Sequence, residues 1–140
     1  MTRFITLMHD KPLVFAHLIA AVAALLLGIA ILTRRKGTFS HRTLGWTWVT
    51  LMAAAAASSV FIRDYKIPNI AGYTPIHLMV PAVFFGLGLA FWMLARRNVR
   101  GHRIAMQITY VSACLVAGGF TLLPNRYLGQ LVWGQWLGLV

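Results

Sequence analysis

Four long apolar runs, separated by short polar or basic stretches, dominate the pattern of this sequence. Each run contains no Lys, Arg, Asp or Glu and reaches the length of about 20 residues that an α-helix needs to cross about 30 Å of hydrocarbon. The pattern therefore predicts four membrane-spanning helices, at residues 12–33, 43–62, 75–95 and 104–123.

The same continuity argues against β-structure. Strands of a membrane barrel alternate polar and apolar side chains over about ten residues, and an open sheet would leave backbone groups unpaired in lipid. We expect an all-α fold, an integral membrane four-helix bundle that forms a single domain over residues 1–140. The apolar tail is too short to cross upright, so residues 124–140 are expected to form a short C-terminal interfacial helix, or alternatively a stub of a fifth span.

Three short motifs of the first half recur in the second half, in the same order and at nearly constant spacing. Recurrence in one order indicates an internal repeat. The predicted repeat is a helical hairpin, with one copy at about residues 12–63 and another at about 75–123. The motif pairs are His17-Leu18 with His77-Leu78, Gly28-Ile29-Ala30 with Gly88-Leu89-Ala90, and His41-Arg42 with His102-Arg103.

Small and aromatic residues suggest how these helices pack. Ala16, Ala20, Ala24 and Gly28 follow one another at a spacing of four, and such stripes let helix backbones approach closely in lipid. The three tryptophans within the second and third runs are expected to face lipid or the headgroup layer, where indole rings concentrate. They are Trp46, Trp48 and Trp92.

Composition supports lipid as the solvent. The chain is 59% hydrophobic and only 11% charged, whereas soluble domains contain about 25% charged residues. A chain of 140 residues has too little interior to hide this much apolar surface from water. The lipid bilayer is thus the expected partner of most of the surface.

The net charge of +11 comes largely from two basic loops rather than from one folded surface, so we expect no nucleic-acid partner. Most of the 13 Lys and Arg residues lie in the first and third connections, which is the positive-inside pattern. It predicts a multi-pass protein of the cytoplasmic membrane, with cytoplasmic basic loops and both termini outside. The loop residues are Arg34, Arg35, Lys36, Arg42, Arg96, Arg97, Arg100 and Arg103.

Histidines are the candidate functional residues, because the only two carboxylates, Asp10 and Asp64, lie outside the apolar runs. His17 and His77 fall near the outer ends of the first and third runs, and His41 and His102 near the cytoplasmic starts of the second and fourth. Each pair comes from repeat-related helices. Two neutral imidazoles facing each other across a bundle are what a haem b iron needs.

The histidines therefore predict cofactor binding. We expect His17 with His77 to ligate an outer haem iron and His41 with His102 to ligate an inner one. The outer pair is favoured if only one haem is present, since it is set deeper. The alternatives are interhelical hydrogen bonds for the outer pair and contact with lipid phosphate for the inner pair.

Two stretches of the sequence resemble those of a known family. In the first, KGTFSHRTLGW, the matching positions are Lys36, Gly37, His41, Arg42, Gly45 and Trp46. In the second, GHRIAMQITY with the downstream TLLPNRYLGQLVWG, they are His102, Arg103, Met106, Tyr110, Pro124 and Arg126. They resemble bacterial predicted membrane proteins grouped as domain-of-unknown-function family 2306. The resemblance implies a multi-pass membrane protein and implies no reaction.

The function expected from the sequence is haem b binding with electron transfer across the membrane. The paired histidines also resemble transmembrane di-haem cytochromes b, but in arrangement only. The alternative is a non-catalytic membrane accessory or a lipid- or small-solute-binding module. Small-residue faces are compatible with docking to another membrane protein or with a homodimer.

Overall fold

The computed structural model describes residues 8–63, 70–123 and 127–136 of the chain, and within these residues it is helical without a strand. An isolated antiparallel bridge joins Ile70 to Tyr73. Asp64, Pro124 and Arg126, which the sequence analysis singled out, lie outside the described residues. The long segments are α2 (Pro12–Thr33), α3 (Phe39–Ser59), α4 (Met79–Ala95) and α5 (Val99–Tyr110).

Shorter segments extend or follow the long helices. The 3-10 helix η1 (Pro75–Leu78) leads into α4, and the π-helix η2 (Val111–Val116) with α6 (Ala117–Thr121) continues α5. The tail contains α7 (Tyr127–Gln130) and the π-helix η3 (Leu131–Trp136).

Within the described residues, three helices are long and apolar enough to cross a membrane: Pro12–Thr33, Pro75–Ala95 and Val99–Thr121. The all-helical fold and these three candidate spans agree with the sequence-based prediction. Helix α3 has 21 residues but is not among the three.

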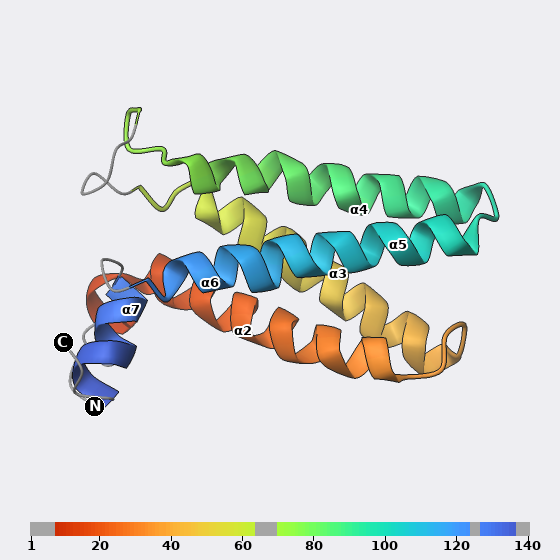
Figure 1. The fold of residues 1–140 in the computed structure, drawn as a ribbon, viewed down its shortest axis with the longest axis horizontal. Helices are drawn as coiled ribbons and strands as arrows, with labels where there is room; N and C mark the ends of the chain where they lie inside the picture. Colours follow the sequence, from red (N-terminus) through yellow and green to blue (C-terminus); the bar gives the residue numbers. More distant parts are fainter. Residues whose placement is uncertain (1–7, 64–69, 124–126, 137–140) are drawn as a thin grey trace.

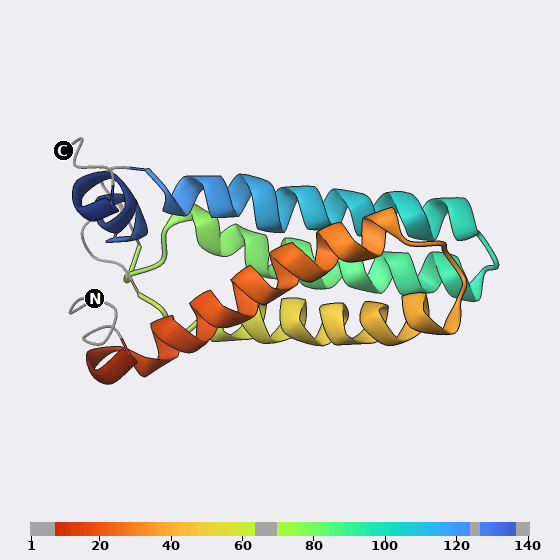
Figure 2. The ribbon, with the colours of Figure 1, turned by 90° about the horizontal axis from the view of Figure 1, so that it is seen from below.

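The long segments run side by side as two hairpins, α2 with α3 and α4 with the α5–η2–α6 segment (Figure 1). Helix α3 also contacts α4, and η2 contacts α2, so the contacts close into a ring in which α2 lies diagonally across from α4. Helix α3 then lies diagonally across from α5. Both basic connections lie at one end, and the start of α2 and the tail lie at the other end (Figures 1 and 2).

Capping explains where the helices begin and end at the basic end. Thr38 accepts a hydrogen bond from the backbone N–H of His41 at 3.1 Å and caps α3. Asn98 caps α5 in the same way through Gly101 at 2.8 Å. The ammonium of Lys36 donates to the carbonyls of Ile31 and Leu32, at 2.9 and 2.6 Å, and so satisfies acceptors that a helix C-terminus leaves free.

The core lies where the four segments meet, and it contains a tryptophan that we expected to face lipid. Trp48 is only 5% exposed, whereas Trp46 and Trp92 are 61% and 52% exposed. The expectation for Trp48 is wrong because its indole N–H donates to the carbonyl of Ala24 at 3.0 Å, which draws the ring into the interior.

Close helix approach at the small-residue stripe of α2 is confirmed at its C-terminal half. Gly28 is buried, and the ring of Tyr110 from α5 packs where a Cβ at Gly28 would stand. The hydroxyl of Tyr110 donates to the carbonyl of Leu25 at 3.1 Å. Tyr110 thus joins the second hairpin to the first.

The C-terminal segment is helical and turns away from the axes of the long helices (Figure 1). The indole N–H of Trp133 donates to the carbonyl of Leu122 at 2.7 Å. This bond ties the segment to the end of α6, where the chain leaves its last long helix.

Candidate functional site

The four predicted site histidines lie in two groups at opposite ends of the long helices. His17 is on α2 and His77 is on η1, toward the end where α2 starts. His41 and His102 are near the first residues of α3 and α5, beside the basic connections. Each pair comes from diagonally opposed helices, which is the arrangement required of two ligands on either side of a central group.

His17 joins α2 to the last turns of α3. Its Nδ1–H donates to the carbonyl of Ala55 at 2.9 Å and also lies 3.0 Å from the hydroxyl oxygen of Ser58. That hydroxyl donates to the same carbonyl at 3.0 Å. Because a carbonyl only accepts, Nδ1 carries the proton and Nε2 holds the lone pair. This is the tautomer that ligating histidines commonly adopt.

His77 uses both ring nitrogens. Its Nε2–H donates to the carbonyl of Ile62 at 2.9 Å, and its Nδ1 accepts from the backbone N–H of Thr74 at 3.1 Å. Tyr73 meets the ring edge-on with 5.1 Å between the ring centroids. His77 therefore closes the 3-10 turn and pins it to the residues that follow α3. In this arrangement neither nitrogen offers a lone pair to a metal.

His102 adopts the same tautomer as His17. Its Nδ1–H donates to the carbonyl of Ala90 on α4 at 2.9 Å, which leaves the lone pair on Nε2. The ring of Phe91 lies 6.4 Å from the imidazole and stacks on Trp46 of α3 at 5.1 Å. Aromatic side chains thus fill the space between α3 and α4 next to His102.

Among the described residues, His41 is the histidine with a buried ring nitrogen that lacks a hydrogen-bond partner. Its Nδ1 is buried and has no hydrogen-bond partner among the described residues, a condition that costs free energy and calls for an explanation. Burial lowers the pKa of His41 below its usual value, and the charges of Lys36 and His102 lower it further. The lowered pKa favours the neutral form of the His41 imidazole.

A metal ion held by side chains alone has no ligand set within residues 8–63, 70–123 and 127–136, where no three His, Cys, Asp or Glu side chains converge. A haem iron needs fewer, because the porphyrin supplies four nitrogens and the protein one or two axial ligands. In the inner pair, Nδ1 of His41 has no hydrogen-bond partner among the described residues, and Nε2 of His102 holds a lone pair. The outer pair as arranged offers only His17.

The sequence pointed to the histidines but not to their partners. Ala55, Ile62 and Ala90 act through backbone carbonyls, which no side-chain pattern identifies. Ser58 differs from these partners because it has a polar side chain. Its hydroxyl within an alanine-rich helix could have suggested a hydrogen bond to His17. The π-helix η2, directly after Tyr110, also has no signature in the sequence that we could identify.

These features define a polytopic helical membrane protein with histidines at both ends of its helices. The family model described as predicted membrane protein (DUF2306) matches residues 14–118, three quarters of the chain. The chain therefore belongs to this family, as its sequence motifs suggested. Neither the curated proteins nor the solved structures contain a significant match to it.

Proposed function

We propose that this protein binds haem b between His41 and His102 and passes electrons across the membrane. The observation that carries the proposal is the buried Nδ1 of His41, which has no partner in the described part of the chain and lies at the same end of the long helices as His102. An axial bond to iron would satisfy this nitrogen. Bound haem supplies one-electron chemistry, and its axial ligands set the potential.

The proposal includes a full four-helix membrane bundle. Helix α3 would be the fourth span, through its charge-free residues 43–62, because it contacts both α2 and α4. The two hairpins would be copies of one repeat, with Thr38 and Asn98 as equivalent helix caps. The basic connections would face the cytoplasm of a bacterial inner membrane, with the termini outside.

The outer pair is the proposed second haem site. His17 already has the tautomer of a ligand, but His77 would have to release the carbonyl of Ile62 or the N–H of Thr74. The hydrogen bonds therefore favour the inner pair as the first site to fill. Two haems, one near each face, would give the electron a path through the bilayer.

A non-catalytic membrane module is the second candidate. Its support is that His17, His77 and His102 each join two helical segments by a hydrogen bond to a backbone carbonyl. In that function the histidines stabilise the helix packing, and lipid or a partner protein is the only ligand.

A visible spectrum separates the two functions. Protein purified in mild detergent with haem supplied should show a sharp Soret band, with α and β bands after dithionite reduction. His41→Ala and His102→Ala should remove the inner-site signal, while Arg35→Ala, an exposed basic residue at the same end, should retain it. A folded protein without absorbance would overturn the haem proposal. Equal haem content in all three variants would overturn the ligand assignment.

A further inference from the structure

Positive charge at the basic end of the protein is not balanced by acids. The two connections and the helix turns beside them contain eight Lys and Arg residues, at positions 34–36, 42, 96, 97, 100 and 103. The only acids in the chain are Asp10, before the first apolar run, and Asp64, after the second. Neither basic segment therefore contains a carboxylate, and this end of the molecule fits a partner with negative charge.

Some of these cations already have partners within the chain. The guanidinium of Arg34 donates to the hydroxyl of Ser40 at 3.0 Å, and that of Arg96 lies 5.0 Å from the centre of the Trp92 ring. Arg42 differs from both. Its side chain is exposed and has no hydrogen bond, ion pair or ring contact with the described residues.

Trp46 lies one helical turn after Arg42 on the same face of α3, since residues four positions apart in a helix are neighbours. Its side chain is 61% exposed, and its ring stacks on Phe91 of α4 with 5.1 Å between the ring centroids. The indole N–H has no hydrogen-bond partner among the described residues. Two unpaired donors, a guanidinium and an indole N–H, therefore share one exposed face of the helix.

This face of α3 lies at the boundary between water and hydrocarbon. Arg42 is the last charged residue before the apolar run 43–62, and Trp46 lies within that run. In the proposed crossing of α3 the guanidinium is at the depth of lipid phosphate, and the indole is about 6 Å deeper. One and two turns beyond Trp46, the same face has the small exposed side chains of Thr50 and Ala54. The Thr50 hydroxyl donates to the carbonyl of Trp46 at 3.0 Å, so it presents no unpaired hydrogen to an acyl chain.

We propose that this face of α3 binds one anionic phospholipid from the leaflet at the basic end. The lipid phosphate accepts hydrogen bonds from the guanidinium of Arg42 and the indole N–H of Trp46, and an acyl chain lies along Thr50 and Ala54. The inference rests on the proposed crossing of α3 and is independent of haem.

The occupant follows from the position of the two donors. A free phosphate ion makes no use of the small, apolar side of the helix, and a soluble acidic protein does not reach an indole within the span. A zwitterionic lipid can occupy the same place, but the excess of positive charge at this end favours a headgroup with net negative charge.

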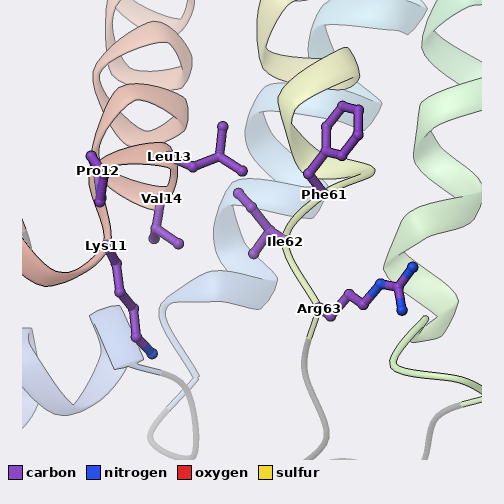
Figure 3. Close-up of a pocket in the computed structure, with 7 residues that line it drawn as sticks. All are labelled: Lys11, Pro12, Leu13, Val14, Phe61, Ile62 and Arg63. Carbon is purple, nitrogen blue, oxygen red and sulfur yellow. The ribbon is translucent and has the colours of Figure 1, made fainter.

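The groove at the opposite end supplies a control rather than a second site. It has a volume of about 390 Å³ and mostly apolar walls, between the start of α2 and the residues that follow α3 (Figure 3). The side chain of Arg63 extends away from Leu13 and Ile62 (Figure 3), and its guanidinium lies 5.4 Å from the centre of the Tyr73 ring. Lys11, which is exposed, is the cation of this end used as a control below.

The test is a competition between lipids of different charge. The protein is placed in nanodiscs of equal parts phosphatidylglycerol and phosphatidylcholine and transferred to detergent, and the retained lipids are counted by native mass spectrometry. The wild type should keep one phosphatidylglycerol in preference to phosphatidylcholine. Arg42→Gln should reduce that preference about fivefold, the equivalent of about 1 kcal/mol for one cation near an anionic surface. Trp46→Phe, which loses one hydrogen bond, should reduce phosphatidylglycerol retention about threefold.

Two controls remove the same charge elsewhere. Arg35→Gln changes an exposed arginine of the same basic connection, and Lys11→Gln an exposed lysine at the opposite end. Each should change the lipid preference less than twofold. Helical circular dichroism and a single elution peak establish that each variant is folded. Washing the wild type with inorganic phosphate before the measurement should leave the lipid in place.

Equal retention of both lipids by the wild type would overturn the proposal. So would equal losses in Arg42→Gln and Arg35→Gln, which would mean diffuse attraction to the basic end, and so would release of the lipid by phosphate. If Arg42→Gln does not fold, wild-type retention persisting in Trp46→Phe overturns the proposal equally. Visible spectra of the same samples keep the two proposals apart. A colourless protein that retains phosphatidylglycerol contradicts the haem proposal alone, and a haem-loaded protein with no lipid preference contradicts this one alone.

Discussion

Tyr110 and Gly28 are in direct contact, with the phenol ring occupying the space that a Cβ at residue 28 would fill. The contact joins α5 to α2, and the tyrosine hydroxyl reaches the carbonyl of Leu25 within the same helix. One residue without a side chain therefore lets the second hairpin pack on the first.

Gly28→Ala tests this contact. A methyl group would push the Tyr110 ring outward, and overpacking of a well-filled site costs about 1–3 kcal/mol. Thermal unfolding in detergent should show the loss. Gly88→Ala is the matched control, because Gly88 occupies the corresponding motif in α4 and a Cβ there meets nothing within 4 Å. Equal stability of the two variants would contradict the packing described.

Trp48→Phe tests the buried indole. The substitution keeps an aromatic ring but removes the N–H that donates to Ala24, and a hydrogen bond contributes about 0.5–1.5 kcal/mol net. We expect destabilisation of that size in the same unfolding assay. Trp46→Phe should be nearly neutral, since Trp46 is largely exposed and a phenyl ring can still stack on Phe91. A larger loss of stability in Trp46→Phe than in Trp48→Phe would mean that Trp48 faces lipid.

The lowered pKa of His41 predicts a pH dependence with a definite sign. In the unfolded chain the imidazole takes up a proton as the pH falls below about 6.5, whereas in the folded protein it does so only at lower pH. The unfolded state binds more protons in that window, so stability is complete above it and decreases as the pH falls through it. Unfolding of the haem-free protein from pH 8 to pH 5 should show this decrease.

His41→Gln is the control for that measurement. It removes the titrating group and keeps a polar side chain, so its stability should change less with pH than that of the wild type. The other histidines are present in both proteins and cancel in the comparison. Parallel pH profiles would show that His41 titrates normally.

The orientation in the membrane can be tested with single cysteines. In a Cys114→Ala background, Asp10→Cys and Arg35→Cys place thiols at exposed positions at opposite ends of α2. A membrane-impermeant thiol reagent applied to spheroplasts should label Asp10→Cys and leave Arg35→Cys unlabelled until the membrane is permeabilised. Labelling of Arg35→Cys alone would reverse the proposed topology. Labelling of both thiols in intact spheroplasts would mean that α2 does not span.

The sequence by itself determined where the helices lie. A charge-free stretch of about 20 residues has few alternatives to a helix in lipid, because every backbone group must be paired within the segment. The helix caps at Thr38 and Asn98 also depend on the local sequence, because each side chain accepts a hydrogen bond from the backbone N–H of the residue three positions later. The sequence motifs also indicated the family, and the match over residues 14–118 confirmed the family.

Only the tertiary structure decided which side of each helix faces inward. Trp46 and Trp48 are the same residue type two positions apart, yet one is exposed and the other buried. Lipid and protein interior are both apolar, so hydrophobic periodicity does not separate the two faces of a spanning helix as it does in water. The tertiary structure also determines which ring nitrogen of His17, His77 and His102 carries the proton, because it brings a backbone carbonyl from another part of the chain next to that nitrogen.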